Sequence, residues 1–196
     1  MDPGQLRHPY AVSLIGYPGY ESIASAAILI IFLAVCSGPD KDRGKEGFVL
    51  KSPAFKYDAR IPGRYTCDGE NISPEFVWSG VPAAAKSLVL ICEDLAPETN
   101  LFVHWVVYDI PPASKGLPQN VPKVAQLPDG SRQAYNNRFQ LGYFGPCPGN
   151  ETHQYVFELY ALDVRIEREY PLSARQVVLL MENHIIAKAL YLGTYR

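Results

Sequence analysis

The sequence predicts a mostly β domain, a sandwich or barrel of antiparallel strands, with one helix near the C-terminus. Three observations carry this prediction. The 196 residues include 17 prolines, 15 glycines and 13 tyrosines, a composition typical of short strands joined by turns. From Phe48 to Ala161, short apolar or alternating runs are separated by proline and glycine. After Pro171 the apolar pattern changes to a helical period.

The strand-like runs follow one another without an internal repeat. They lie at residues 51–55, 61–69, 75–82, 87–97, 101–112 and 153–162. Residues 112–150 are mostly loop by composition. Loops of this length on a small β scaffold usually cover a core edge or build a site.

The last segment predicts a helix that begins after Ser173. Ser173 and Gln176 match a capping box, and Leu172 with Val177 can form a hydrophobic staple. A helical face follows, with Gly193 expected to end the helix after Leu192. The members of this face are Val177, Leu180, Met181, His184, Ile185 and Ala189. We expect the stripe to pack on the sandwich, with His184 as a core histidine that has a hydrogen-bond partner.

Composition limits the partners of the protein. The chain is 47% hydrophobic and 19% charged, which is enough material for one domain or a domain with a targeting segment. A net charge of -2 argues against binding nucleic acid or an anionic membrane through bulk charge. Any anion site must therefore be local.

The N-terminal region resembles an export signal. Residues 22–35 are apolar and uncharged, but shorter than the ~20 residues of a spanning helix. The run ends at Cys36, a candidate lipidation site, and a polar linker follows. We therefore expect residues 1–45 to be a signal peptide or lipoprotein-like segment with a linker, and residues 46–196 to be the folded domain.

An export signal predicts that the protein lies in the cell envelope or outside the cell, with membrane contact only through the N-terminal anchor. A short uncleaved anchor, or a buried helix of a cytoplasmic protein, is the alternative.

The four cysteines give no metal-binding pair. None lies in a CxxC motif, so a structural zinc site has no support. If Cys36 is lipidated and Cys92 is buried in its apolar run, Cys67 and Cys147 remain as a possible disulfide. Two reduced cysteines in turns remain the alternative.

Polar side chains gather where two strands begin. Strict alternation places His104 on one face with Phe102, Val106 and Tyr108, and places Val103, Trp105 and Val107 on the other. His153 and Tyr155 share a face in the same way with Phe157 and Leu159. Glu93 and Asp94 lie at a strand exit, and a glycine- and proline-rich turn precedes His153. We expect these groups to form a polar pocket with apolar walls, although each could be ordinary strand or turn material.

These motifs together resemble the phosphatidylethanolamine-binding protein family, in particular its prokaryotic members similar to Raf kinase inhibitor protein. The similarity runs from about Phe48 to Arg196 and rests on "YTCDGENISPEFVWSGVP", "SLVLICEDLAP", "VHWVVYDIP", "GPCP", "HQYVFELYALD" and "HIIAKALYLGTY". The resemblance implies a two-sheet antiparallel β-sandwich with a C-terminal α-helix packed beside a ligand cavity. That cavity takes phosphate-like or acetate-like anions.

The resemblance also implies the site residues. They are Asp94 or Glu93, His104, Gly145, Pro146, His153 and Tyr155, with Phe102 as the aromatic wall. The run "EDLAP" departs from the family pattern "DPDAP", which leaves Asp94 and Glu93 both open, and we favour Asp94. Gln154 replaces an arginine but points to the opposite face.

The sequence therefore predicts a non-enzymatic binding protein for phosphate or a lipid headgroup, without a cofactor. Asp94 is expected to orient a histidine and keep it protonated. One alternative is an inhibitor of a kinase or serine protease that acts through loops 112–150. A second, less favoured, is a metalloenzyme that uses His104, His153 and Asp94 as a facial triad.

Overall fold

The computed structural model describes residues 47–96, 102–168 and 171–196, and this part of the chain is mostly β. The predicted export segment and Cys36 lie outside the described residues. The longer strands are β3 (Phe76–Ser79), β4 (Ser87–Asp94), β5 (Phe102–Ile110), β8 (His153–Leu162) and β9 (Ile185–Tyr195). The short elements are β1 (Val49–Lys51), β2 (Ala59–Arg60), the 3-10 turn η1 (Gly63–Tyr65), β6 (Gly116–Leu117), β7 (Arg132–Gln133) and the helix α1 (Ala174–Met181). No helix in the described ranges is long and apolar enough to span a membrane.

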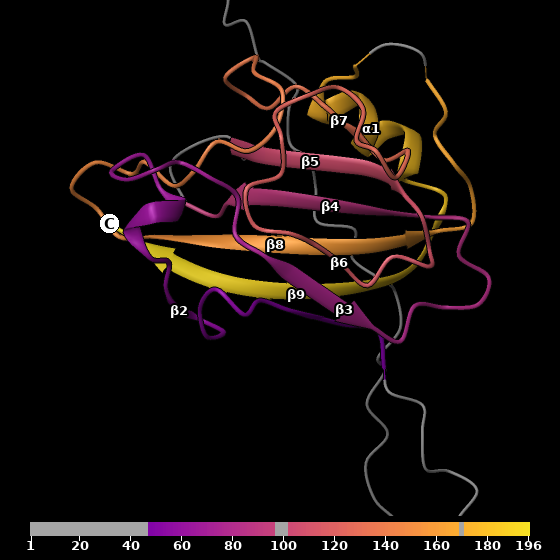
Figure 1. Ribbon diagram of the computed structural model, residues 1–196, viewed down its shortest axis with the longest axis horizontal. Coiled ribbons are helices and arrows are strands. Elements are labelled where there is room, and N and C mark those ends of the chain that lie inside the picture. The colour runs from indigo at the N-terminus through magenta and orange to yellow at the C-terminus, as the bar shows by residue number, and fades with distance from the viewer. Residues whose placement is uncertain (1–46, 97–101, 169–170) are drawn as a thin grey trace, which may run out of the picture. The chain divides into compact units, whose positions relative to one another are not determined.

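The strands form two sheets. The larger sheet has the order β2-β9-β8-β4-β5-β7, and the smaller has the order β1-β3-β6 (Figure 1). Nearly all neighbouring strands are antiparallel, as expected. The exception is β2, whose two residues pair with β9 in parallel. The main core draws from both sheets, with Phe76 and Trp78 from β3 and Leu90, Phe157 and Tyr191 from the larger sheet.

The capped helix begins as predicted but ends much earlier. Ser173 Oγ accepts a hydrogen bond from Gln176 N, and the Gln176 side chain accepts from Ser173 N, so the capping box is complete. The helix ends at Met181, and the chain from Ile185 to Tyr195 is strand β9. The predicted continuation to Leu192 is therefore wrong.

The reason is strand pairing. The run after Asn183 fits period 2 as well as period 3.6, and β9 pairs with β8 along almost its whole length. Gly193 is not a helix stop: a Cβ atom there would meet Ile61 Cγ1 at 2.7 Å and Phe55 Cε2 at 2.8 Å. His184 precedes β9 and its Nδ1 lies 2.8 Å from Asp163 Oδ1. Both side chains are about half exposed, so His184 has a partner but is not a core histidine.

The helix packs on the outer face of the larger sheet, near β5 (Figure 1). Its buried residues Ala174, Val177 and Met181 join a second core cluster with Val106 and Tyr108. His153 and Tyr155 lie on the opposite, inner face of that sheet. The position of α1 thus differs from the expected place beside the ligand site.

Candidate functional site

His104 reaches the inner face of the sheet through an irregularity in β5. Trp105 pairs with Cys92 and Val103 pairs with Glu93, so His104 is the extra residue of a β-bulge. The bulge breaks strict alternation and places Val106 on the helix-covered side, with Trp105 in the core between the sheets. Tyr108 also lies on the helix-covered side and Val107 in the core. The predicted faces of β5 are therefore wrong beyond His104.

The two histidines flank one tyrosine. The ring centroids of His104 and Tyr155 are 5.3 Å apart, and those of His153 and Tyr155 are 6.4 Å apart. Tyr155 pairs with Asp94 across β8 and β4, and Asp94 pairs with Phe102 across β4 and β5. Three neighbouring strands thus bring these side chains together from distant parts of the chain.

Asp94 is the carboxylate that meets a histidine. Its Oδ2 lies 2.7 Å from His153 Nδ1, and both side chains are mostly buried. Asp94 also caps its own turn, because Oδ1 accepts a hydrogen bond from Ala96 N. Glu93 lies on the other face of the sheet. Burial is the main cause that raises its pKa there, and the Glu158 charge raises it further. The structure therefore places Asp94, and not Glu93, beside the histidines.

His104 forms a two-way link with Phe144. Its Nδ1 lies 2.7 Å from Phe144 O, so Nδ1 carries the proton that is donated, and Phe144 N donates to His104 O at 3.0 Å. Burial lowers the pKa of His104 and the nearby Arg138 charge also lowers it, while the backbone carbonyls of Phe144 and Gly145 and the Asp94 charge oppose this shift. The lowered pKa favours the neutral ring, and with Nδ1 bonded to Phe144 O, Nε2 is the nitrogen left to meet a ligand.

Tyr155 is completely buried, and its hydroxyl has no hydrogen-bond partner among the described residues. Burial is the largest cause that raises its pKa, and Asp94 raises it further, both through its charge and through the approach of its side chain to the hydroxyl as an acceptor. The Cys147 backbone acts in the opposite direction and therefore lies close to the hydroxyl. The phenol thus stays protonated, and the Asp94 carboxylate is the protein group that competes with a ligand for its proton.

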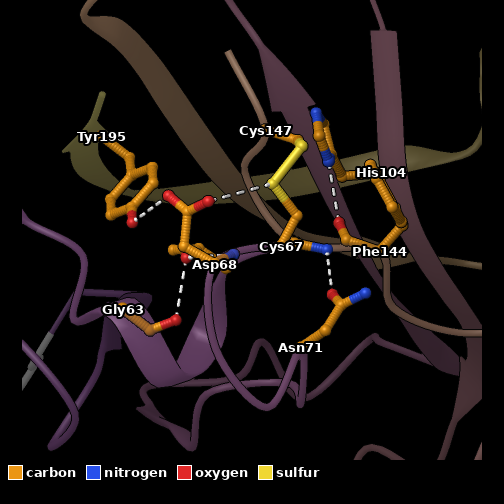
Figure 2. Close-up of a disulfide and its surroundings, with 10 residues drawn as sticks. Gly63, Cys67, Asp68, Asn71, His104, Phe144, Cys147 and Tyr195 are labelled. Atoms are coloured by element: carbon orange, nitrogen blue, oxygen red, sulfur yellow. Dashed lines mark hydrogen bonds between the residues drawn. A yellow bond between two sulfur atoms is a disulfide. The ribbon is translucent and has the colours of Figure 1, made fainter. Parts of the chain in front are cut away.

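The backbone groups of Gly145 and Pro146, in the turn before His153, have protein partners. Gly145 N donates to Asn71 Oδ1 at 2.7 Å, so this N–H already has a protein partner. Proline has no N–H, and Pro146 O accepts from Cys67 N at 3.0 Å. Cys67 and Cys147 form a disulfide next to His104 and Phe144 (Figure 2). Cys92 is buried and free.

Two further aromatic rings, those of Phe102 and Phe144, contact His104. The Phe102 ring centroid lies 4.7 Å away, and the Phe144 ring stacks on the imidazole at 5.7 Å. The Arg138 guanidinium lies 4.4 Å from the centre of the Phe144 ring. The sequence did not single out Asn71, Arg138 or Phe144, because neither spacing nor periodicity distinguishes a loop residue that folds back onto a site.

The facial triad is not assembled. The described residues contain no group of three or more His, Cys, Asp or Glu side chains that could hold a metal ion. A separate open pocket of about 540 Å³ lies elsewhere, lined by residues 49–53, 55–57 and Tyr191. Its lining includes Lys51 and Lys56 but no histidine.

Comparison with known proteins decides the family. The family model for phosphatidylethanolamine-binding protein matches residues 51–196. The chain belongs to the phosphatidylethanolamine-binding protein family. A UPF0098 protein of Methanothermobacter thermautotrophicus is 51% identical over 147 residues, which cover 75% of this chain and 97% of the relative. A UPF0098 protein of Aquifex aeolicus is 41% identical over 148 residues, covering 74% and 86%.

Solved structures agree with this family. The phosphatidylethanolamine-binding protein homologue CT736 of Chlamydia trachomatis is 39% identical with a TM-score of 0.68, covering 76% of this chain and 97% of its own. Escherichia coli YbcL, described as a member of the mammalian PEBP family, is 29% identical with a TM-score of 0.70, covering 76% and 98%. The resemblance predicted from six short motifs is confirmed.

Proposed function

We propose that this family member binds a phosphate-like anion or a phosphoryl headgroup at His104, His153, Asp94 and Tyr155. The observation that carries the proposal is the buried Tyr155 hydroxyl, which has no described partner within hydrogen-bond distance although the Asp94 carboxylate lies near it. Leaving such a group unsatisfied costs about 1–3 kcal/mol, and a ligand oxygen that accepts from it would recover this cost.

The hydrogen-bonding groups favour a ligand that both accepts and donates. Tyr155 offers an O–H, while neutral His104 offers the Nε2 lone pair. A monoprotonated phosphate or phosphomonoester presents oxygens for the first and a P–OH for the second. His153, held by Asp94, adds a further donor when its imidazole is protonated.

The carboxylate of Asp94 need not repel the anion, because its charge faces the His153 imidazole. Two charge-assisted hydrogen bonds, from Tyr155 and from protonated His153, contribute about 1.5–3 kcal/mol each before the cost of immobilising the ligand, and the neutral bond to His104 contributes about 0.5–1.5 kcal/mol. We therefore expect a dissociation constant roughly between mM and µM for a bare headgroup.

Calorimetric titration with inorganic phosphate and with phosphoethanolamine tests the proposal on the full chain. Tyr155→Phe removes only the hydroxyl, so we expect the fold to be kept and binding to weaken on the order of tenfold or more. Tyr108→Phe is the matched control, since Tyr108 carries the other buried hydroxyl without a described partner but lies under the helix. Equal binding by wild type and Tyr155→Phe would overturn the proposed site.

We further propose binding without catalysis, and export of the protein. The disulfide supports an oxidising compartment, since disulfides persist mainly outside the cytoplasm. Alkylation of thiols in protein isolated directly from cells, followed by mass spectrometry, would detect Cys67 and Cys147 as unmodified if this is right. Full alkylation of both would contradict it.

A further inference from the structure

The segment from Tyr65 to Asn71, here called the brace, holds the turn formed by residues 143–147. Three hydrogen bonds join them. Tyr143 Oη donates to Tyr65 O at 2.7 Å, Cys67 N donates to Pro146 O at 3.0 Å, and Gly145 N donates to Asn71 Oδ1 at 2.7 Å. The Cys67–Cys147 disulfide adds a covalent tie (Figure 2).

The two segments touch at backbone distance. A Cβ atom on Gly145 would meet Tyr65 O at 2.4 Å and Thr66 Cα at 2.8 Å. Only glycine leaves room for this approach, so contact with the brace restricts the position of the turn. Asn71 is itself held in the left-handed region, with φ of 55°, a conformation that asparagine tolerates better than most residues.

The placement of this turn decides which nitrogen of His104 carries a proton. The residue before Gly145 is Phe144, whose carbonyl accepts from His104 Nδ1 at 2.7 Å. Moving Gly145 by about one ångström would take that carbonyl beyond hydrogen-bond distance. The imidazole could then carry its proton on Nε2, and the acceptor that it offers a ligand would be lost.

We propose that Asn71 is a positioning residue for the anion site: by holding Gly145 it keeps Phe144 O on His104 Nδ1 and so presents Nε2 as an acceptor. Asn71 acts through the turn and need not touch the ligand. The proposal deepens the proposed function, since it assigns a residue that controls which protonated forms of phosphate the site accepts.

Two substitutions separate positioning from general stabilisation. Asn71→Gly removes the acceptor and relieves the left-handed backbone, so the backbone itself does not strain the fold. Asn71→Asp keeps an oxygen acceptor and also tolerates positive φ. Tyr143→Phe is the matched control, because it removes another bond of the brace without touching Gly145.

The decisive readout is the tautomer of His104, from ¹⁵N NMR of histidine rings in the full chain. We expect one tautomer, protonated at Nδ1, in wild type, Asn71→Asp and Tyr143→Phe, and a mixture in Asn71→Gly. Phosphate binding measured by calorimetry should fall on the order of tenfold in Asn71→Gly and change less than about threefold in the other two.

The tautomer is read without ligand, so its outcome is independent of the proposed function. If wild type fails to bind phosphate but the tautomer changes as expected, the function is wrong and the positioning role stands. A single Nδ1 tautomer in folded Asn71→Gly would overturn the positioning role. Should Asn71→Gly fail to fold, Asn71→Ser serves in its place, since its shorter side chain withdraws the acceptor from Gly145.

Discussion

Replacing Glu93 by glutamine should make the protein more stable at alkaline pH. Glu93 lies on the outer face of the larger sheet, on β4, diagonally across from Glu158 on β8. Glu158 is ion-paired with Lys188 and accepts a hydrogen bond from the Tyr160 hydroxyl. Burial, and then the charge of Glu158, raise the pKa of Glu93 from 4.5 to about 7, while Lys188 opposes the shift.

The sign follows from proton uptake. Below pH of about 4.5 the folded and unfolded chains both carry the proton, and between 4.5 and 7 only the folded chain keeps it. The free energy of unfolding therefore falls as pH rises through this window. At 1.36 kcal/mol for each pH unit, the full loss is about 3 kcal/mol, an upper bound because the half-buried side chain retains contact with water.

Urea unfolding at pH 5 and pH 8 measures this loss. Glu93→Gln carries no proton to lose, so its stability relative to wild type should rise by roughly 2–3 kcal/mol between the two pH values. Glu151→Gln, an exposed glutamate before β8, serves as the control and should keep the wild-type profile. An unchanged pH slope in Glu93→Gln would refute the reasoning.

Two further substitutions test the loops around the site. Gly145→Ala should lower stability by about 2 kcal/mol or more and weaken phosphate binding, because its Cβ would lie 2.4 Å from Tyr65 O; a stable alanine variant seen in thermal unfolding would contradict the close packing. Phe139→Gly should raise the free energy of unfolding by about 1 kcal/mol. Phe139 has φ of 58° and is 88% exposed, so its left-handed backbone is unfavourable and its ring gains little from packing. Here a lower Tm in the glycine variant would show that the aromatic ring contributes more than its exposure indicates.

Much of the β architecture could be read from local patterns. Proline and glycine separate the strands, and Ser173 with Gln176 marks the start of the helix because capping is decided within four residues. The end of the helix could not be read in this way. The residues after Asn183 fit both the helical period of 3.6 and the strand period of 2. Whether they form a helix or a strand depends on pairing with β8, which no local pattern contains.

The site was predictable where alternation holds and not where it fails. His153 and Tyr155 share a face of β8 with Phe157, as strict alternation predicts. His104 lies in a bulge, so the faces assigned beyond it were wrong. Asn71 was missed because its contact with Gly145 joins two loops 74 residues apart.

The most direct test of the anion site is a crystal structure of the full chain grown or soaked with inorganic phosphate at neutral pH. The account predicts a phosphate oxygen within about 3 Å of Tyr155 Oη, with other oxygens near His153 and His104 Nε2. Phosphate bound instead at Lys51 and Lys56, with the Tyr155 hydroxyl still without a partner, would contradict it.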